Sequence, residues 1–157
     1  MPRVVLLVNP YSSGVTRERV ARVELVLRAS AEVVTRLTEA PGHAAELAAA
    51  AAASGDTDAV VVLSGDGTYN EALNGAAGEI PFAFLPGGGA SVLPHALGLP
   101  RDPVAAAAIV ADALATGRTR TVGLGRVNGR RFSFAAGIGL DAAVIRRVEA
   151  RGRDRDG

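Results

Sequence analysis

The sequence has no cysteine, lysine or tryptophan, and these absences exclude several kinds of site. Without cysteine there are no disulfides and no thiolate metal sites, which fits a cytosolic protein. Without lysine the chain cannot use a P-loop lysine, so any phosphate clamp must use backbone N–H groups or arginine. Aromatic residues make up only 4%, and the net charge of +1 includes no long run of one sign. We therefore expect no nucleic-acid partner, because such surfaces combine a basic stripe with stacking aromatics.

Long apolar runs are also missing. The first one, residues 4–8, is too short for the apolar region of a signal peptide. No stretch approaches the roughly 20 residues that a membrane span requires. We therefore expect a cytoplasmic protein. Apolar residues still make up 48% of the 157-residue chain, which is enough for the core of one domain, or of one domain and part of another.

Short strands alternate with helices over the first 117 residues. Runs that are apolar at every position predict strands covered on both faces, and the spacing of Val20, Val23 and Leu27 predicts a helix. Asp102 and Pro103 are typical of a helix start. The predicted strands are 4–8, 31–37, 59–63 and 81–85, and the predicted helices are 16–29, 42–54, 68 to 75 or 78, 92–97 and 103–116. This alternation predicts an α/β fold with a doubly wound parallel sheet and right-handed crossovers.

The pattern changes near residue 120. Asn128 and Gly129 predict a hairpin between strands 121–128 and 130–136, followed by a helix over 140–150. We expect an α/β domain over residues 1–119, the start of a β-rich second domain over 120–150, and a disordered tail over 151–157. A hairpin and one helix make a poor core, so we expect the chain to be a fragment of a longer protein.

Three loops that contain glycine follow predicted strands, after Val8, Leu63 and Leu85. In doubly wound sheets, ligands bind outside the carboxyl ends of the strands, and all three loops fall at that edge. The third loop, residues 86–91, has three successive glycines, which usually serve close approach. Ser91 is the predicted N-cap of the following helix, with Pro94 in its first turn.

The central motif is Ser-Gly-Asp-Gly-Thr, residues 64–68. Its glycines permit close ligand approach, and the N–H groups of the following helix start would face an anion, which predicts a phosphate site. Asp66 is a candidate ligand for Mg²⁺ that bridges phosphates. The alternative is structural, because Thr68 and Glu71 also form a capping-box pattern and Asp-Gly is an ordinary turn. Its position beside the two other loops favours the phosphate site.

In order and spacing, the three motifs resemble the catalytic domain of diacylglycerol kinases, a family with sphingosine, ceramide and bacterial lipid kinases. The resemblance covers about residues 3–150, although the central motif is shared with NAD kinases and 6-phosphofructokinases. It implies an α/β domain like that of NAD kinase and diacylglycerol kinase, with ATP in a cleft against a β-sandwich domain. It also implies Mg²⁺, a lipid acceptor at the membrane surface and a role in lipid metabolism.

The nucleotide contacts that the resemblance implies come from all three loops and two neighbouring segments. They are Asn9, Pro10, Ser12, Ser13, Gly14, Thr38, Gly65, Asp66, Gly67, Thr68, Glu71, Gly88, Gly89 and Ala90. Asp66 is also the implied metal ligand. Residues 137–142 match a family segment early in the second domain, and the general base is expected beyond residue 157. The resemblance therefore implies that this fragment is inactive alone.

The chain departs from the family pattern at several positions. Ser64 stands where most members have glycine, and Ala90 and Ser91 replace a threonine and an asparagine. Loss of one neutral hydrogen bond costs about 0.5–1.5 kcal/mol, so we expect ATP binding to weaken about tenfold. Pro94 and His95 replace an alanine and an arginine, and His95 either takes over a phosphate contact or is solvated.

Several alternatives stay open. One is a kinase of a soluble substrate such as NAD or a sugar phosphate, and another is a nucleotide-binding module without catalysis. The arginines near the end of the chain form either a solvated helix face or a contact with anionic lipid headgroups. They are Arg146, Arg147, Arg151 and Arg153. The identity of the lipid and a homodimeric state are not determined by the sequence.

Overall fold

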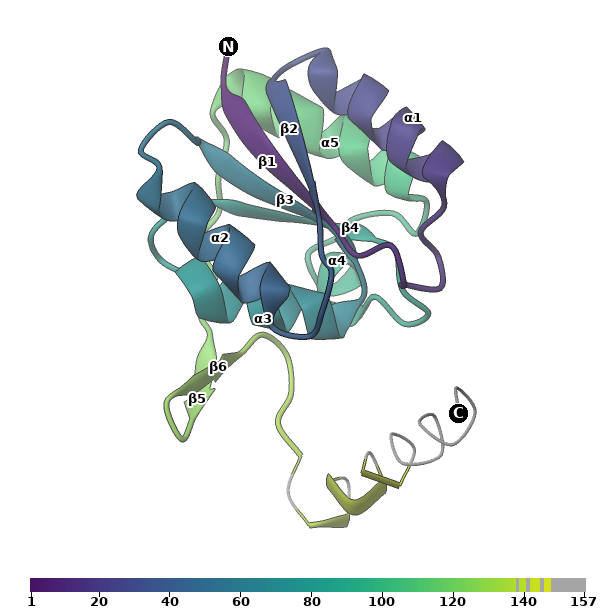
Figure 1. The fold of residues 1–157 in the computed structure, drawn as a ribbon, viewed down its shortest axis with the longest axis vertical. Helices are drawn as coiled ribbons and strands as arrows, with labels where there is room; N and C mark the ends of the chain where they lie inside the picture. The colour runs from purple at the N-terminus through teal and green to yellow at the C-terminus, as the bar shows by residue number, and fades with distance from the viewer. Residues whose placement is uncertain (138, 141, 145, 148–157) are drawn as a thin grey trace.

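The computed structural model describes residues 1–137, 139–140, 142–144 and 146–147. Its centre is a four-stranded parallel sheet in the order β2-β1-β3-β4 (Figure 1). The strands are β1 (Arg3–Val8), β2 (Glu32–Leu37), β3 (Ala59–Ser64) and β4 (Phe82–Pro86). The helices are α1 (Arg17–Arg28), α2 (His43–Ala53), α3 (Asp66–Ala76), α4 (Val92–Ala96) and α5 (Pro103–Thr116). The predicted α/β fold with a parallel sheet is confirmed.

Helices cover both faces of the sheet, with α1 and α5 on one face and α2 and α3 on the other (Figure 1). The predicted apolar runs are the central strands, and β3 is buried at all six positions. Alternate side chains of each strand enter two separate cores, one under each helical layer. Each of these strands therefore needs apolar residues on both of its faces.

The register places the carboxyl ends of the strands level with one another. Val8 of β1 pairs with Leu37 on one side and Leu63 on the other, and Leu63 pairs with Leu85. The three glycine-bearing loops therefore leave the sheet at one edge. This arrangement was predicted from the alternation of strands and helices.

The predicted ends of α5 are confirmed, and the residues that form them are close together in the sequence. The Ala105 N–H donates to Asp102 at 3.0 Å, Pro103 opens α5, and Gly117 ends it with a left-handed φ of 64°. Helix α5 has 14 residues, fewer than the roughly 20 that a membrane span requires. Within the residues described above, no helix combines the length and apolar character needed to cross a bilayer.

A hairpin of β5 (Gly125–Val127) and β6 (Arg130–Phe132) follows the sheet domain. Asn128 and Gly129 have φ values of 48° and 79°, as a two-residue hairpin turn requires. The predicted hairpin is therefore correct, but the predicted strand lengths are wrong, because pairing stops after three residues on each side.

Residues 138, 141, 145 and 148–157 lie outside the described part of the chain. The predicted helix over 140–150 falls partly there, and the predicted tail over 151–157, with Arg151 and Arg153, falls there entirely. The boundary near residue 120 between two domains stays a prediction.

Candidate functional site

The three loops at the carboxyl edge pack directly against one another. The Gly14 N–H donates to the Gly87 carbonyl at 2.9 Å, and the Gly87 N–H donates to the Ser64 carbonyl at 2.7 Å. A Cβ on Gly88 would lie 2.7 Å from the Gly65 Cα, and one on Gly14 would lie 2.9 Å from the Gly87 oxygen. Gly14 and Gly88 thus allow the backbones of different loops to pack closely, and the close approach of a ligand to the glycines stays a prediction.

Side chains add further ties between these loops. Asn9 Nδ2 donates to Thr68 Oγ1 at 3.1 Å, and the hydroxyls of Ser12 and Ser64 lie 2.8 Å apart. The buried Tyr69 hydroxyl donates toward the carbonyls of Leu85, at 2.6 Å, and Ser64. Burial raises the pKa of Tyr69 above its ordinary value, because the phenolate would be poorly solvated there. These contacts make the edge one connected unit.

Asp66 acts as a cap for a neighbouring helix. Its carboxylate oxygens accept the N–H groups of Val92 at 3.0 Å and Leu93 at 3.1 Å. Ser91 occupies the N-cap position of α4, as predicted, with a φ of 47°. Its hydroxyl makes no cap bond to the helix and bonds instead to the backbone of Gly88.

The capping-box interpretation of Thr68 and Glu71 is wrong. Helix α3 begins at Asp66 with Gly65 as its N-cap, two residues earlier than predicted, so Thr68 lies inside the helix. Thr68 Oγ1 accepts from Asn9, and Glu71 Oε2 accepts the Gly42 N–H at 3.0 Å. Both side chains connect α3 to other loops. A capping box at the start of the helix therefore does not explain the residues of the central motif.

The turn before α2 lies beside the same edge. Thr38 is 6% exposed and its N–H donates to the Val8 carbonyl at 2.9 Å. His43 Nδ1 accepts the Glu39 N–H at 3.1 Å, so this histidine helps to hold the turn. Five of the predicted nucleotide-contact residues are exposed and therefore accessible to a ligand. They are Pro10, Ser13, Gly67, Gly89 and Ala90.

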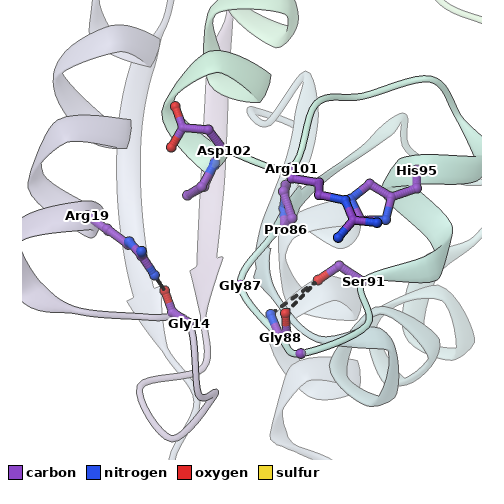
Figure 2. Close-up of a pocket in the computed structure, with 11 residues that line it drawn as sticks. Gly14, Arg19, Pro86, Gly87, Gly88, Ser91, His95, Arg101 and Asp102 are labelled. Carbon is purple, nitrogen blue, oxygen red and sulfur yellow. Dashed lines mark hydrogen bonds between the residues drawn. The ribbon is translucent and has the colours of Figure 1, made fainter.

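A hollow of about 350 Å³ lies between α1, the loop after β4 and the start of α5 (Figure 2). Figure 2 shows Arg19 and Gly14 on one side of it and Arg101, His95 and Ser91 on the other. Its lining consists of Gly14, Arg19, Pro86, Gly87, Gly88, Gly89, Ser91, His95, Arg101, Asp102 and Pro103. Arg19 Nη1 donates to the Gly14 carbonyl at 2.7 Å, and Asp102 caps α5. The hollow is therefore rich in glycine backbone and cationic.

Sequence reasoning missed Arg19 and Arg101. The absence of lysine pointed to arginine as the phosphate-binding cation, but no spacing indicated which arginines, because one lies on α1 and the other precedes α5. His95, noted as a replacement for an arginine, does line this hollow. Its Nε2 is buried and has no hydrogen-bond partner among the described residues.

A second hollow of about 230 Å³ lies on the other side of the central motif. It is formed by Asp66, Gly67 and Asn70 of α3 together with Phe132 at the end of β6 and the three residues 133–135 that follow it. The side chain of Asn74 holds the two walls together. Its Oδ1 accepts the Arg131 N–H at 2.8 Å, and its Nδ2 donates to the Arg131 carbonyl at 3.0 Å.

The chain is similar to known lipid kinases. The model of the diacylglycerol kinase catalytic domain matches residues 3–127. A diacylglycerol kinase of Mycobacterium tuberculosis is 35% identical over 150 residues, covering 90% of this chain and 47% of the relative. A diacylglycerol kinase of Bacillus subtilis is 33% identical over 144 residues, covering 88% of this chain and 46% of the relative. The chain thus spans about half the length of these curated relatives.

The solved structures agree with the sequence relatives. A crystal structure of a diacylglycerol kinase from Bacillus anthracis superimposes with a TM-score of 0.73 at 27% identity. It covers 83% of this chain and 47% of that protein. The family match and the shared fold show that the chain belongs to the family of diacylglycerol kinase catalytic domains.

Proposed function

We propose that the chain is the nucleotide-binding part of an ATP-dependent kinase that phosphorylates a lipid hydroxyl. The main support for the proposal is that three glycine loops pack together at one edge of the sheet, beside a hollow that is lined by Arg19 and Arg101. Named diacylglycerol kinases among the relatives support the lipid acceptor. Phosphoryl transfer depends mainly on positioning and on neutralising charge, and this edge offers both.

Arginine and backbone groups would hold the phosphates. The loop after β4 exposes N–H groups at Gly89 and Ala90, and Arg19 and Arg101 provide planar forks that bind phosphate oxygens in pairs. Since Arg19 also donates to the Gly14 carbonyl, its guanidinium is already held at the mouth of the first loop. Less side-chain entropy is then lost when a phosphate binds.

The residues present fit a Mg²⁺ ion that is shared with the phosphates. Asp66 would hold it, because each carboxylate oxygen accepts one N–H and keeps a further lone pair. Mg²⁺ usually takes one or two carboxylates, with phosphates and water completing its coordination. When bound, it would neutralise charge on the phosphates. Within the described residues no group of three or more potential metal ligands occurs, which fits this shared mode.

The acceptor would approach from the second hollow. Phe132 and Phe134 give that hollow an apolar wall next to Asp66 and Gly67. An apolar chain could lie against the phenylalanines while its hydroxyl reached the phosphate turn. We expect the enzyme to take such an acceptor at a membrane surface.

The described residues by themselves would bind nucleotide without transferring phosphate. In the part of the chain that the structure describes, Asp66 and Glu71 accept backbone N–H groups and Asp102 caps α5. Of these three carboxylates only Asp66 lines the second hollow, and we assign it to Mg²⁺, so the base toward a lipid hydroxyl would have to come from another residue. This observation also favours the second candidate, a nucleotide-binding module without catalysis.

A phosphoryl-transfer assay tests the proposal. Labelled ATP is offered with diacylglycerol, sphingosine or NAD to the 157-residue chain and, in parallel, to any longer form of the protein. We expect lipid phosphorylation only from a form of the protein that adds a general base to the described residues. Turnover of NAD alone would support a kinase of a soluble substrate. ATP binding without transfer at any length would support the non-catalytic module.

A further inference from the structure

We propose that Ser64 is a positioning residue that orients the Ser12 hydroxyl, so that Ser12 donates a hydrogen bond to a phosphate of the nucleotide. This inference rests on the proposed function, since it concerns the same nucleotide site. Ser64 is the last residue of β3 and is 0% exposed, and its Oγ lies 2.8 Å from Ser12 Oγ.

Burial determines which of the two hydroxyls donates. If Ser12 donated, the Ser64 proton would need another acceptor, and the structure gives the Ser64 hydroxyl no partner except Ser12 among the described residues. A buried donor without an acceptor is unfavourable, because it has given up its hydrogen bond to water without a replacement. Ser64 therefore donates and Ser12 accepts. The Ser12 proton is then left for an acceptor on the more exposed side, because Ser12 itself is only half-buried.

Both ends of the first loop are hydrogen-bonded to neighbouring loops or helices. Asn9 at its start is bonded to Thr68 of α3, and the Gly14 N–H at its end is bonded to the Gly87 carbonyl. Ser12 is thus fixed beside the turn that begins with Gly65, next to the predicted position of the phosphates. A donated proton also strengthens the accepting hydroxyl as a donor in turn, because hydrogen bonds in a chain polarise one another.

The ligand class follows from the direction of the donor. Phosphate oxygens accept hydrogen bonds and cannot donate when ionised, so a hydroxyl fixed as a donor favours a phosphate. A freely rotating hydroxyl would serve donors and acceptors equally. The orientation should therefore matter for ATP and not for adenosine, which lacks phosphates.

Calorimetry with two ligands tests this. Affinities for Mg-ATP and for adenosine are measured on the wild type, Ser12→Ala, Ser64→Ala and the double variant. Ser54→Ala is the matched control, because that hydroxyl bonds to the Ala51 carbonyl far from the glycine loops. We expect ATP affinity to fall about fivefold for Ser12→Ala and about threefold for Ser64→Ala, within the usual range for one hydrogen bond. The double variant should match Ser12→Ala, and adenosine affinity should stay unchanged throughout.

The outcomes separate this inference from the proposed function. If wild-type chain binds no ATP, the nucleotide site fails and the orientation of Ser12 fails with it. If ATP binds and Ser64→Ala has wild-type affinity, this inference alone is overturned. It is also overturned if the two losses add in the double variant, or if adenosine weakens equally, since either result means a general disturbance of the loop. Ser64→Gly, the family residue, replaces Ser64→Ala if thermal unfolding shows that the alanine variant does not fold.

Discussion

The parallel sheet and the hairpin are stabilised by different means. Every residue of β3 is buried between two helical layers, whereas Val127 in the hairpin is 47% exposed. The hairpin is joined to α3 by the two hydrogen bonds between Asn74 and the Arg131 backbone. Because an isolated pair of strands is marginal in water, its position depends on this contact. The loops at the sheet edge are therefore held by many contacts with one another, whereas the hairpin wall of the second hollow is joined to α3 by the two Asn74 bonds.

The largest effect is expected where α2 and α3 touch. A Cβ on Gly75 would lie 2.2 Å from the Ala45 carbonyl oxygen. Glycine to alanine within a helix usually stabilises by roughly 0.5–1 kcal/mol, but here we expect Gly75→Ala to lose about 3 kcal/mol, since the helices must separate. Denaturant unfolding measures the change. Gly67→Ala, in the same helix with open space around it, is the control and should not be destabilised.

Tyr69→Phe should have an intermediate effect on stability. It removes the hydroxyl that ties the ends of β3 and β4 through the Ser64 and Leu85 carbonyls. We expect a loss of about 1–2 kcal/mol, because a buried acceptor is left without its donor. Tyr11→Phe, at a position that is 82% exposed, should change unfolding by less than about 0.5 kcal/mol. Equal effects of the two variants would contradict a stabilising role for the hydrogen bonds of the Tyr69 hydroxyl.

The same tyrosine gives a pH dependence with a definite sign. Burial raises the pKa of Tyr69 in the folded state above its unfolded value of about 10. Its contribution to stability is complete below that pH and is lost as the pH rises beyond it, because the unfolded chain then releases the proton more readily. We expect the difference in unfolding free energy between wild type and Tyr69→Phe to shrink above about pH 10. A difference that stays constant or grows would show that the pKa is not raised.

The smallest global effect is expected at the hairpin. Asn74→Ala removes both bonds to Arg131 and should change global unfolding by less than about 1 kcal/mol, because neither sheet core is touched. Amide exchange at Arg131 should quicken about tenfold, while Val61 and Val62 in β3 stay protected. Asn74→Asp keeps the acceptor for the Arg131 N–H and should give a smaller increase. Faster exchange throughout the sheet would mean that the hairpin is part of the core.

Most of the fold was predictable because its signals are local. Apolar runs gave the strands, and Asp102, Pro103 and Gly117 marked the ends of α5. The errors arose where distant residues decide. Glu71 bonds to Gly42 instead of closing a capping box. Ser91 is the N-cap of α4 as predicted, but the distant Asp66 carboxylate accepts the first N–H groups of that helix.

The site was predictable only in outline for the same reason. The glycine loops could be placed at one edge, but Arg19 and Arg101 meet only through the topology. Ser64 could be noticed as a departure from the family, yet its partner Ser12 is 52 residues away in sequence. ATP, Mg²⁺ and the lipid acceptor stay predictions.

Amide exchange with and without Mg-ATP tests the nucleotide site most directly. We expect protection of the loops at Gly14, Gly65–Thr68 and Gly87–Ala90, with the amides of the hairpin unchanged. Arg101→Ala should weaken ATP binding about tenfold, as loss of a charge-assisted contact does. Arg28→Ala, whose guanidinium pairs with Glu24, should not weaken it. Absence of ATP binding, or protection confined to residues away from these three loops, would contradict the account.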